Sequence, residues 1–486
     1  MSTKGFRAAA GEGGPNHMSV EEFRVNAYRV VDWLCDYYEN IESFPVLSEV
    51  EPGFVRSSLP LSAPIAPEDF SIIMKDLEEV LLPGITHWQS PNFFGYFPAN
   101  ASPPSILGEM ISAGLGVQGM LWLTSPSCTE LETLVLDWII DMLALPQFYK
   151  STGKGGGVIQ DSASSAVLCA LLAAREAIQK NSACETGTDP RLVGYCSEEA
   201  HSSVEKAFSI AGLGRRRLRR VRTDSEGALS LEYLEAQMAS DIEGGLLPFF
   251  ICATVGTTST LSSDRVQELG SLASTNKCWL HVDAAMAGTA SICPEFRYLN
   301  RGLELTDSYC FNPHKWMLTN FDCNCFYVND RRPLNAAMSV LPEYLKNEKS
   351  DKSEVIDFRD WQIPLGRRFR SLKLWFVIRS YGVEGIRQFV RSHAKLAKDF
   401  AQWVSADRDF ELVTYTGLNL VCFRVMGDDR KNRVLLDTLN KTGRIFLSHT
   451  VVEGRFVLRL CVGQVRVDEK TVIRAWETIK TVAAGL

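Results

Sequence analysis

The chain has no long apolar run, no excess of positive charge and no leader-like N-terminus, and each absence excludes a class of protein. No stretch of about 18 consecutive apolar residues occurs, so no membrane-spanning helix is expected. The net charge of −7 gives no electrostatic reason to expect nucleic acid or an anionic membrane as a partner. Residues 1–18 lack the apolar core of a signal peptide and are predicted to be a disordered tail. We therefore expect a cytoplasmic protein.

The cysteines follow no pattern that a disulfide framework or a metal site requires. There are 13 of them, an odd number, scattered through apolar segments such as residues 167–172 and 278–282. This distribution indicates buried thiols in a reducing compartment. Cys323 and Cys325 stand two residues apart, but no second pair accompanies them, so we predict no metal site.

Three structured regions are predicted after the tail, which makes an α/β protein. Residues 19–102 form an N-terminal arm: Ser19 and Glu22 match a capping box before an amphipathic helix, and the prolines between residues 43 and 68 favour extended chain. Such an arm is expected to pack on a partner subunit. Residues 103–372 alternate short apolar runs with helical stretches, which predicts a large domain with a mostly parallel sheet flanked by helices. Residues 373–486 predict a smaller C-terminal α/β domain.

Two residues at the predicted edge of the sheet carry the chemistry. Asp283 ends the apolar run 279–283, and ligands of α/β sheets bind at the carboxyl ends of strands. Lys315 lies in Phe-Asn-Pro-His-Lys-Trp (311–316), where apolar neighbours would lower its pKa and free its amine to attack a carbonyl. Taken alone, such an aspartate is more often a helix cap or half of a buried ion pair, and such a lysine a surface residue. Together they match the two halves of a pyridoxal phosphate (PLP) site, in which Asp283 keeps the ring nitrogen protonated and Lys315 binds the aldehyde.

Two further segments suit the phosphate and the ring of this cofactor. Residues 155–165, Gly-Gly-Gly-Val-Ile-Gln-Asp-Ser-Ala-Ser-Ser, lead into an Ala/Leu-rich helix, whose first N–H groups and hydroxyls are a natural phosphate site. A glycine run alone is usually only a loop, and the spacing G-x-G-x-x-G of dinucleotide sites is absent. His201 follows a predicted strand, so its ring can stack on the cofactor, although an isolated histidine there is more often a cap.

In this order the motifs resemble the group II PLP-dependent decarboxylases, specifically the aromatic-L-amino-acid decarboxylase family, from about Val20 to the C-terminus. The resemblance implies a fold-type I enzyme that works as a homodimer with its active sites at the subunit interface. It places His314 near the substrate carboxylate. It assigns to the cofactor, besides Asp283 and Lys315, the residues Ala163, Ser164, His201, Thr254, Ala285 and Asn312.

The substrate pocket is expected to be aromatic. Residues 87–98 are rich in aromatic rings, which suits burial of an aromatic substrate, although core packing accounts for some of them. The strip offers no cation for a side-chain carboxylate, which argues against a glutamate decarboxylase. Gly366 lies where plant relatives tune ring size, and glycine there favours Phe and Trp over Tyr or dopa. The resemblance assigns to the pocket, with His201 and His314, the residues Trp88, Tyr96, Phe97, Pro98, Leu121 and Gly366.

One departure from the family concerns the product. The family's mobile catalytic loop is recognisable at residues 347–361, and decarboxylases carry a tyrosine in its Asp-Tyr-Lys-Asp-Trp motif, where this chain has Asp357-Phe-Arg-Asp-Trp361. Loss of CO2 leaves negative charge at Cα, which a decarboxylase must protonate to release an amine. Phe358 has no proton to donate, so the charge can react with O2 instead. We therefore predict the activity of an aromatic acetaldehyde synthase; the alternatives are a plain decarboxylase and an inactive PLP-fold scaffold.

Three other departures affect the expected affinity for PLP. Asp161 stands where relatives usually have glycine, and an acid beside a phosphate is unfavourable unless it points away. Ser165 replaces a usual glutamate, and Met286 replaces a tyrosine common in plant members. These substitutions leave the prediction of the cofactor itself unchanged, because Asp283, His201 and Lys315 are intact.

Overall fold

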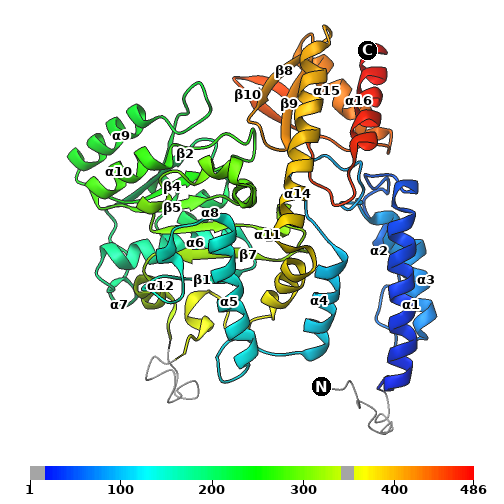
Figure 1. Ribbon diagram of the computed structural model, residues 1–486, viewed down its shortest axis with the longest axis horizontal. Coiled ribbons are helices and arrows are strands. Elements are labelled where there is room, and N and C mark those ends of the chain that lie inside the picture. The colour runs from blue at the N-terminus through cyan, green and yellow to red at the C-terminus, as the bar shows by residue number, and fades with distance from the viewer. Residues whose placement is uncertain (1–16, 341–354) are drawn as a thin grey trace.

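A seven-stranded sheet forms the centre of the larger part of the computed structural model, which describes residues 17–340 and 355–486 (Figure 1). The strand order is β1-β7-β6-β5-β4-β2-β3. Strands β6, β5, β4, β2 and β3 run parallel, and β7 is antiparallel to both β1 and β6. The prediction of a mostly parallel sheet is confirmed. The strands are β1 (Gly156–Gln160), β2 (Leu192–Ser197), β3 (Leu218–Val221), β4 (Leu247–Thr254), β5 (Trp279–Asp283), β6 (Ser308–Phe311) and β7 (Asn324–Val328).

Helices cover both faces of this sheet, because successive strand residues point to opposite sides. On β1, for example, Val158 and Ile159 belong to two different apolar clusters. One cluster includes helices α5 (Pro126–Leu143), α9 (Leu231–Glu243) and α10 (Val266–Asn276). The other includes α6 (Ala163–Ile178), α8 (Ser203–Ile210) and α12 (Arg331–Met338). Shorter helices are α7 (Ala183–Thr186) and α11 (Pro313–Trp316).

A second, smaller sheet lies toward the C-terminus and is antiparallel, with the order β10-β11-β9-β8. Its strands are β8 (Phe410–Tyr415), β9 (Leu420–Val425), β10 (Ser448–Val452) and β11 (Arg455–Cys461), accompanied by α15 (Asp429–Lys441) and α16 (Glu469–Ala484). Helix α14 (Arg370–Ala406) joins the two parts, with a break at Gly382, whose φ is 63°. The domain boundary predicted after residue 372 therefore falls inside a helix, and the boundary stays a prediction.

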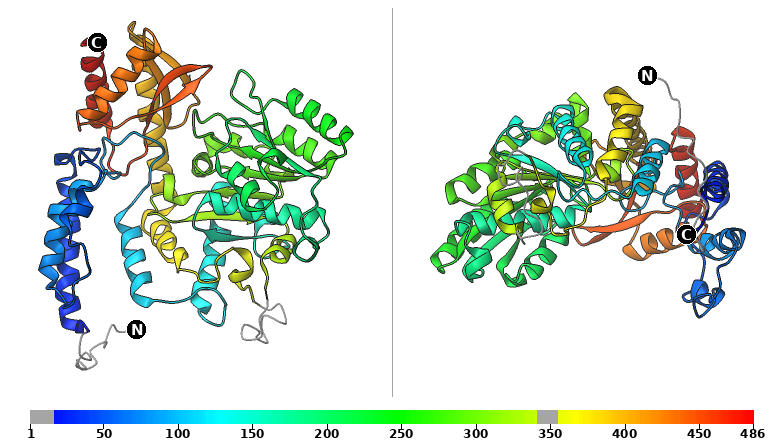
Figure 2. Two further views of the ribbon diagram at one scale, coloured as in Figure 1. Left: turned by 180° about the vertical axis from the view of Figure 1, so that it is seen from behind. Right: turned by 90° about the horizontal axis from the view of Figure 1, so that it is seen from below.

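The N-terminal arm extends along one side of the molecule (Figures 1 and 2). Helix α1 (Val20–Glu39) begins with the predicted capping box: the Glu22 N–H donates to Ser19 Oγ at 3.2 Å, and the Ser19 N–H donates to Glu22 Oε2 at 2.7 Å. No residue of α1 is buried. The proline-rich stretch that follows contains one short helix, α2 (Phe54–Ser58), before α3 (Phe70–Asp76) and α4 (Pro103–Leu115). None of the described helices is long and apolar enough to cross a membrane.

Candidate active site

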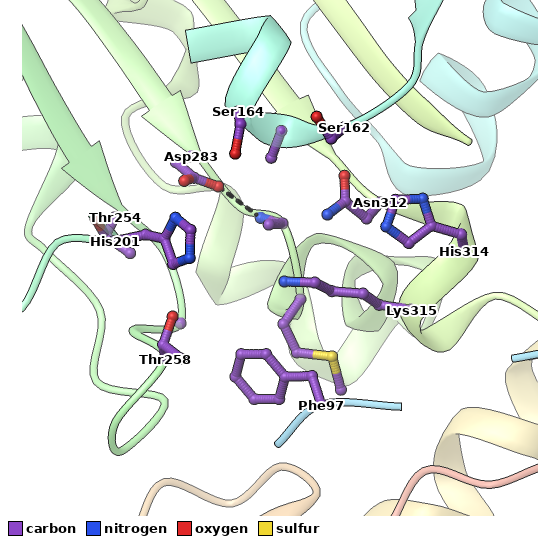
Figure 3. A pocket seen from close by; sticks show the side chains of 14 residues that line it. Phe97, Ser162, Ser164, His201, Thr254, Thr258, Asp283, Asn312, His314 and Lys315 are labelled. Atoms are coloured by element: carbon purple, nitrogen blue, oxygen red, sulfur yellow. Dashed lines mark hydrogen bonds between the residues drawn. The ribbon is translucent and has the colours of Figure 1, made fainter. Parts of the chain in front are cut away.

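A cavity of about 200 Å³ opens at the carboxyl ends of the central strands (Figure 3). This is the edge at which ligands of α/β sheets bind. Met286 also lines the cavity. The sequence-predicted residues that the fold brings together around it are Phe97, Ala163, Ser164, His201, Thr254, Asp283, Ala285, Asn312, His314 and Lys315.

Asp283 is fixed at the end of β5 with one carboxylate oxygen already occupied. Its Oδ1 accepts the backbone N–H of Ala285 at 3.0 Å, the dashed line in Figure 3. The side chain is 4% exposed, so its charge is held in an environment from which water is largely excluded. A buried carboxylate is stable only beside a cation or a hydrogen-bond donor, which is the role that a protonated pyridine nitrogen would fill.

Lys315 extends from α11 into the same cavity. Its Nζ lies 4.9 Å from the centroid of the Phe97 ring. Burial lowers the pKa of the Lys315 amine, and the charge of Asp283 opposes that shift only in part. A lysine with a lowered pKa has more of its amine in the uncharged form, which is the form that condenses with an aldehyde.

His201 presents one defined nitrogen to the cavity. Its Nδ1 accepts the N–H of Ser203 at 3.2 Å, so in the neutral ring the hydrogen is carried by Nε2. Burial lowers the pKa of His201, while Asp283 acts in the opposite direction. Figure 3 shows the His201 ring beside Asp283 and Thr258, where a flat neutral ring can stack on another ring.

The start of α6 and Asn312 form the polar end of the cavity. Ser162 caps the helix by accepting the Ser165 N–H at 3.4 Å, and the first helical residues, Ala163 and Ser164, line the cavity. Asn312 Oδ1 accepts a hydrogen bond from the Asn324 side chain at 2.6 Å, which leaves the side-chain N–H groups of Asn312 for a ligand. Helix N-termini bind phosphate through such free N–H groups. Asp161 is exposed and does not line the cavity, so it points away from this site.

The residues fit PLP at three separated points: an acid for the ring nitrogen, an amine for the aldehyde, and a helix N-terminus for the phosphate. An independent observation also points to a ligand. Thr254 Oγ1 is buried at the cavity wall and has no hydrogen-bond partner among the described residues. Buried polar atoms are normally satisfied, so an unsatisfied one facing a cavity is expected where a ligand completes the bonding.

His314 lines the cavity next to Lys315 as an uncharged donor. Its Nδ1 accepts the Cys323 N–H at 2.9 Å, so the hydrogen of the neutral ring is on Nε2. Burial, with a further contribution from Lys315, lowers the pKa of His314 to about 3. The predicted role at the substrate carboxylate would therefore be that of a neutral hydrogen-bond donor.

Most of the predicted substrate strip lies outside the cavity. Only Phe97 lines it. Trp88 and Tyr96 stack on one another at 5.7 Å between ring centroids, and 37% and 52% of their surfaces remain exposed. Pro98 packs against Gly463, where an added Cβ would lie 2.4 Å from the Pro98 ring. The strip therefore presents exposed aromatic rings that no described residue covers.

Three predicted site residues gather in a different place. Leu121 and Phe358 are buried, and Gly366 lies against the loop that carries Leu121, because the Gly119 N–H donates to the Arg367 carbonyl at 3.1 Å. None of the three lines the Lys315 cavity. Residues 347–354 of the predicted catalytic loop lie outside the described residues. Within a single chain, the predicted site residues thus lie in three places: around the Lys315 cavity, in the strip with Trp88, Tyr96 and Pro98, and beside the loop that carries Leu121.

Gly256 and Thr258 line the cavity but were missed in the sequence. They follow the carboxyl end of β4, as the segment after Asp283 follows β5. The rule that ligands bind at strand ends would have found them, had it been applied to every predicted strand. Ser162 also lines the cavity and was not assigned to the site, although it lies in the predicted phosphate segment 155–165.

The sheet, its helices and this cavity define a fold-type I PLP-dependent enzyme. The chain belongs to the pyridoxal-dependent decarboxylase family, whose conserved domain matches residues 52–426. It is 48% identical to phenylacetaldehyde synthase of Arabidopsis thaliana, with 96% of this chain and 97% of that protein covered. It is 46% identical to tyrosine decarboxylase 2 of Narcissus pseudonarcissus, with 96% and 95% covered. A crystal structure of Oryza sativa TDC with PLP and tryptamine superposes with a TM-score of 0.94 at 40% identity, covering 97% and 99%. The protein is thus a PLP-dependent enzyme of the aromatic amino acid decarboxylase group.

Proposed function

We propose that this enzyme converts an aromatic L-amino acid, O2 and water into the aromatic acetaldehyde, CO2, ammonia and hydrogen peroxide. The observation that carries the proposal is Phe358, which stands where the decarboxylase motif that this loop resembles has a tyrosine. The hydroxyl that would return a proton to Cα is missing, so the carbon that has lost CO2 transfers its electrons to O2. Two electrons reduce O2 to peroxide, and water releases the nitrogen as ammonia.

The side chains of the cavity have separate tasks in this reaction. PLP, when bound, withdraws electrons from Cα so that the bond to the carboxylate can break. Asp283 holds a proton at the ring nitrogen, and Lys315 anchors the cofactor. His314 donates from Nε2 to the substrate carboxylate and orients it. His201 stacks on the ring, and Phe97 contributes apolar surface that excludes water.

A homodimer with composite active sites would account for predicted site residues that lie outside the Lys315 cavity of their own chain. Leu121, Phe358 and Gly366 lie away from the Lys315 cavity of their own chain, so they would serve the cavity of the partner subunit or reach their own after a movement of their segment. The arm supports the same arrangement. Phe23 and Tyr28 on α1 are 60% and 64% exposed, which is unusual for large apolar side chains unless a second chain covers them.

The proposed substrates are Phe and Trp, with Tyr and dopa as weaker candidates. Gly366 has no side chain, which leaves room for a large ring and offers no hydroxyl to a phenol. The names of the relatives include phenyl, hydroxyphenyl and indole compounds. One relative is a phenylacetaldehyde synthase, one is a tyrosine decarboxylase, and one was crystallised with tryptamine. The 13 free cysteines, most of them buried, support a reducing compartment and hence the cytoplasm.

A plain decarboxylase is the second candidate, because one observation favours it. The Nε2 hydrogen of His201 faces the cavity beside Asp283, and this group is a possible proton donor to Cα in place of the missing tyrosine. In that case Phe358 would slow the release of amine without changing the product.

An aerobic assay with Phe, Trp, Tyr and dopa separately tests the proposal by measuring CO2, amine, aldehyde and peroxide. Aldehyde and peroxide formed in step with CO2 are expected. Amine in step with CO2, with little peroxide, would establish the plain decarboxylase. No CO2 from any of the four would contradict both candidates.

A further inference from the structure

A series of buried polar side chains alternates between β5 and β6 and ends at Asp283. The Trp279 indole nitrogen lies 2.7 Å from Ser308 Oγ, which lies 2.8 Å from His281 Nδ1. His281 Nε2 lies 3.8 Å from Cys310 Sγ, and that sulfur lies 3.9 Å from Asp283 Oδ1. The sheet sets these contacts, because His281 is paired with Ser308 and Asp283 with Cys310 in the register of the two parallel strands.

The hydrogen bonds in this series are donated in one consistent direction, from Trp279 toward Asp283. The Trp279 N–H can only donate, so Ser308 Oγ accepts from it, and the only described acceptor for the Ser308 hydrogen is His281 Nδ1. The neutral His281 ring then carries its hydrogen on Nε2 and donates to Cys310 Sγ. The thiol hydrogen of Cys310 is left to donate to Asp283 Oδ1.

Burial keeps His281 neutral, as this direction requires. His281, Ser308 and Cys310 are fully buried. The His281 ring lies between Phe250 and Phe326, at 6.3 and 6.1 Å between centroids. Burial lowers the pKa of His281 to about 3 and raises that of the Cys310 thiol, so neither group ionises near neutral pH.

At the end of this series, the two carboxylate oxygens of Asp283 differ in their hydrogen-bond donors. Oδ1 accepts from the Ala285 N–H at 3.0 Å and from the Cys310 thiol at 3.9 Å. No described side chain or N–H donates to Oδ2, which is therefore the oxygen that remains for a ligand. Two donors on Oδ1 hold the carboxylate in one orientation, which keeps Oδ2 as the oxygen that meets a ligand.

We propose that Cys310, held in place by His281, is a positioning residue that sets the orientation of Asp283 toward the PLP ring nitrogen. The inference rests on the proposed pairing of Asp283 with that nitrogen. Without the thiol donor, the Asp283 carboxylate turns more freely and meets the ring nitrogen less often, so that nitrogen is less protonated. PLP then binds less tightly, because its contact with Asp283 is less ionic.

The test uses PLP labelled with ¹⁵N at the ring nitrogen, bound to the full-length enzyme and to Cys310→Ala, Cys310→Ser and Cys196→Ala. Cys196 on β2 is the matched control: it is a buried cysteine of the same apolar cluster and, among the described residues, makes no hydrogen bond to Asp283. The readouts are the ¹⁵N chemical shift and the dissociation constant of PLP from equilibrium dialysis. Thermal unfolding of each apoprotein separates lost packing from lost hydrogen bonding.

Cys310→Ala is expected to move the ¹⁵N signal toward that of unprotonated pyridine and to raise the dissociation constant by about two- to tenfold, the range of one hydrogen bond. Cys310→Ser keeps a donor, so its ¹⁵N shift and its PLP dissociation constant are expected to be close to those of the unsubstituted enzyme. Cys196→Ala is expected to lower only thermal stability. A ¹⁵N shift in Cys310→Ala equal to that of the unsubstituted enzyme would overturn the inference. If the ring nitrogen gave the ¹⁵N signal of unprotonated pyridine in the unsubstituted enzyme, the assignment of Asp283 itself would be wrong. This outcome is distinct from a failure of the inference about Cys310.

Discussion

The guanidinium carbon of Arg367 lies 4.7 Å from the centroid of the Phe358 ring, and both side chains are buried. The position of the residue that governs the proposed product is therefore tied to a buried cation. Arg367 in turn donates to Glu132 Oε1 at 2.6 Å, and that same oxygen accepts the Ile159 N–H of β1 at 2.8 Å. The segment that carries Phe358 and Gly366 is thus anchored to the central sheet.

Phe358→Tyr is expected to convert the product from aldehyde to amine. The new hydroxyl supplies a proton donor for Cα, so peroxide formed per CO2 should fall at least about tenfold. Peroxide, amine and CO2 are measured together in aerobic assays. Phe358→Leu is the control, because it alters the ring without adding a donor and should leave aldehyde as the product. A product ratio unchanged in Phe358→Tyr would remove the argument from this residue.

Lys315→Arg is expected to abolish turnover, by at least about a thousandfold, since the guanidinium is never deprotonated and cannot condense with an aldehyde. Its visible cofactor absorbance should also be lost. After borohydride reduction, peptide mass spectrometry of the unsubstituted enzyme should find PLP attached at Lys315. Lys470→Arg, at an exposed lysine on α16, is the control and should leave both properties unchanged. Attachment at another lysine would contradict the site.

Arg367→Ala is expected to lower the free energy of unfolding by about 3–5 kcal/mol, because it leaves the buried charge of Glu132 without its partner. The double variant Arg367→Met with Glu132→Leu removes both charges and should recover much of the loss. Denaturant titration measures both. The exposed pair formed by Arg391 and Glu295 is the control, and Arg391→Ala should change stability little. A small effect of Arg367→Ala would mean that the pair is accessible to water.

His393→Gln is expected to reduce the amount by which the free energy of unfolding falls when the pH is lowered. Burial lowers the pKa of His393 to about 3, below its value in the unfolded chain, so the unfolded state binds more protons as the pH falls below about 6.5. The native protein should therefore lose up to about 1.4 kcal/mol per pH unit from this one residue. Glutamine keeps an acceptor for the Trp316 N–H, which donates to His393 Nδ1 at 2.9 Å, but does not titrate. Urea titrations at pH 6.5 and 5.0 give the difference, with His449→Gln, at an exposed histidine, as the control.

Phe23→Asp combined with Val31→Asp is expected to convert a dimer into monomers. Both side chains are exposed apolar groups of α1, and charges there would be buried in the proposed interface. Light scattering measures the molecular mass. Activity should fall as the dimer dissociates, because the proposed active sites contain residues of both subunits. Asp36→Lys, at another exposed position of α1, is the control. A monomeric unsubstituted enzyme with full activity would refute the dimer.

Much of the fold could be predicted because its signals are local. The capping box at Ser19 and the apolar run 279–283 that forms β5 need only neighbouring residues, and both are present where expected. The alternation of apolar runs and helical stretches was sufficient to predict a mostly parallel sheet. It could not predict that β7 inserts antiparallel between β1 and β6, or that α14 continues across the expected domain boundary, because strand partners and helix length depend on contacts between distant segments.

The sequence by itself determined which chemical groups are present: Asp283, Lys315 and His201, the groups proposed to hold PLP, and Phe358, whose ring carries no hydroxyl. Only the tertiary structure decided which groups meet. It brought the strand ends and the start of α6 around one cavity, placed Phe358 under Arg367 outside that cavity, and aligned Cys310 with Asp283. The physical reason is that reactivity belongs to a side chain and its immediate neighbours. Proximity, burial and the direction of a hydrogen bond are set by segments hundreds of residues apart, through strand register and packing.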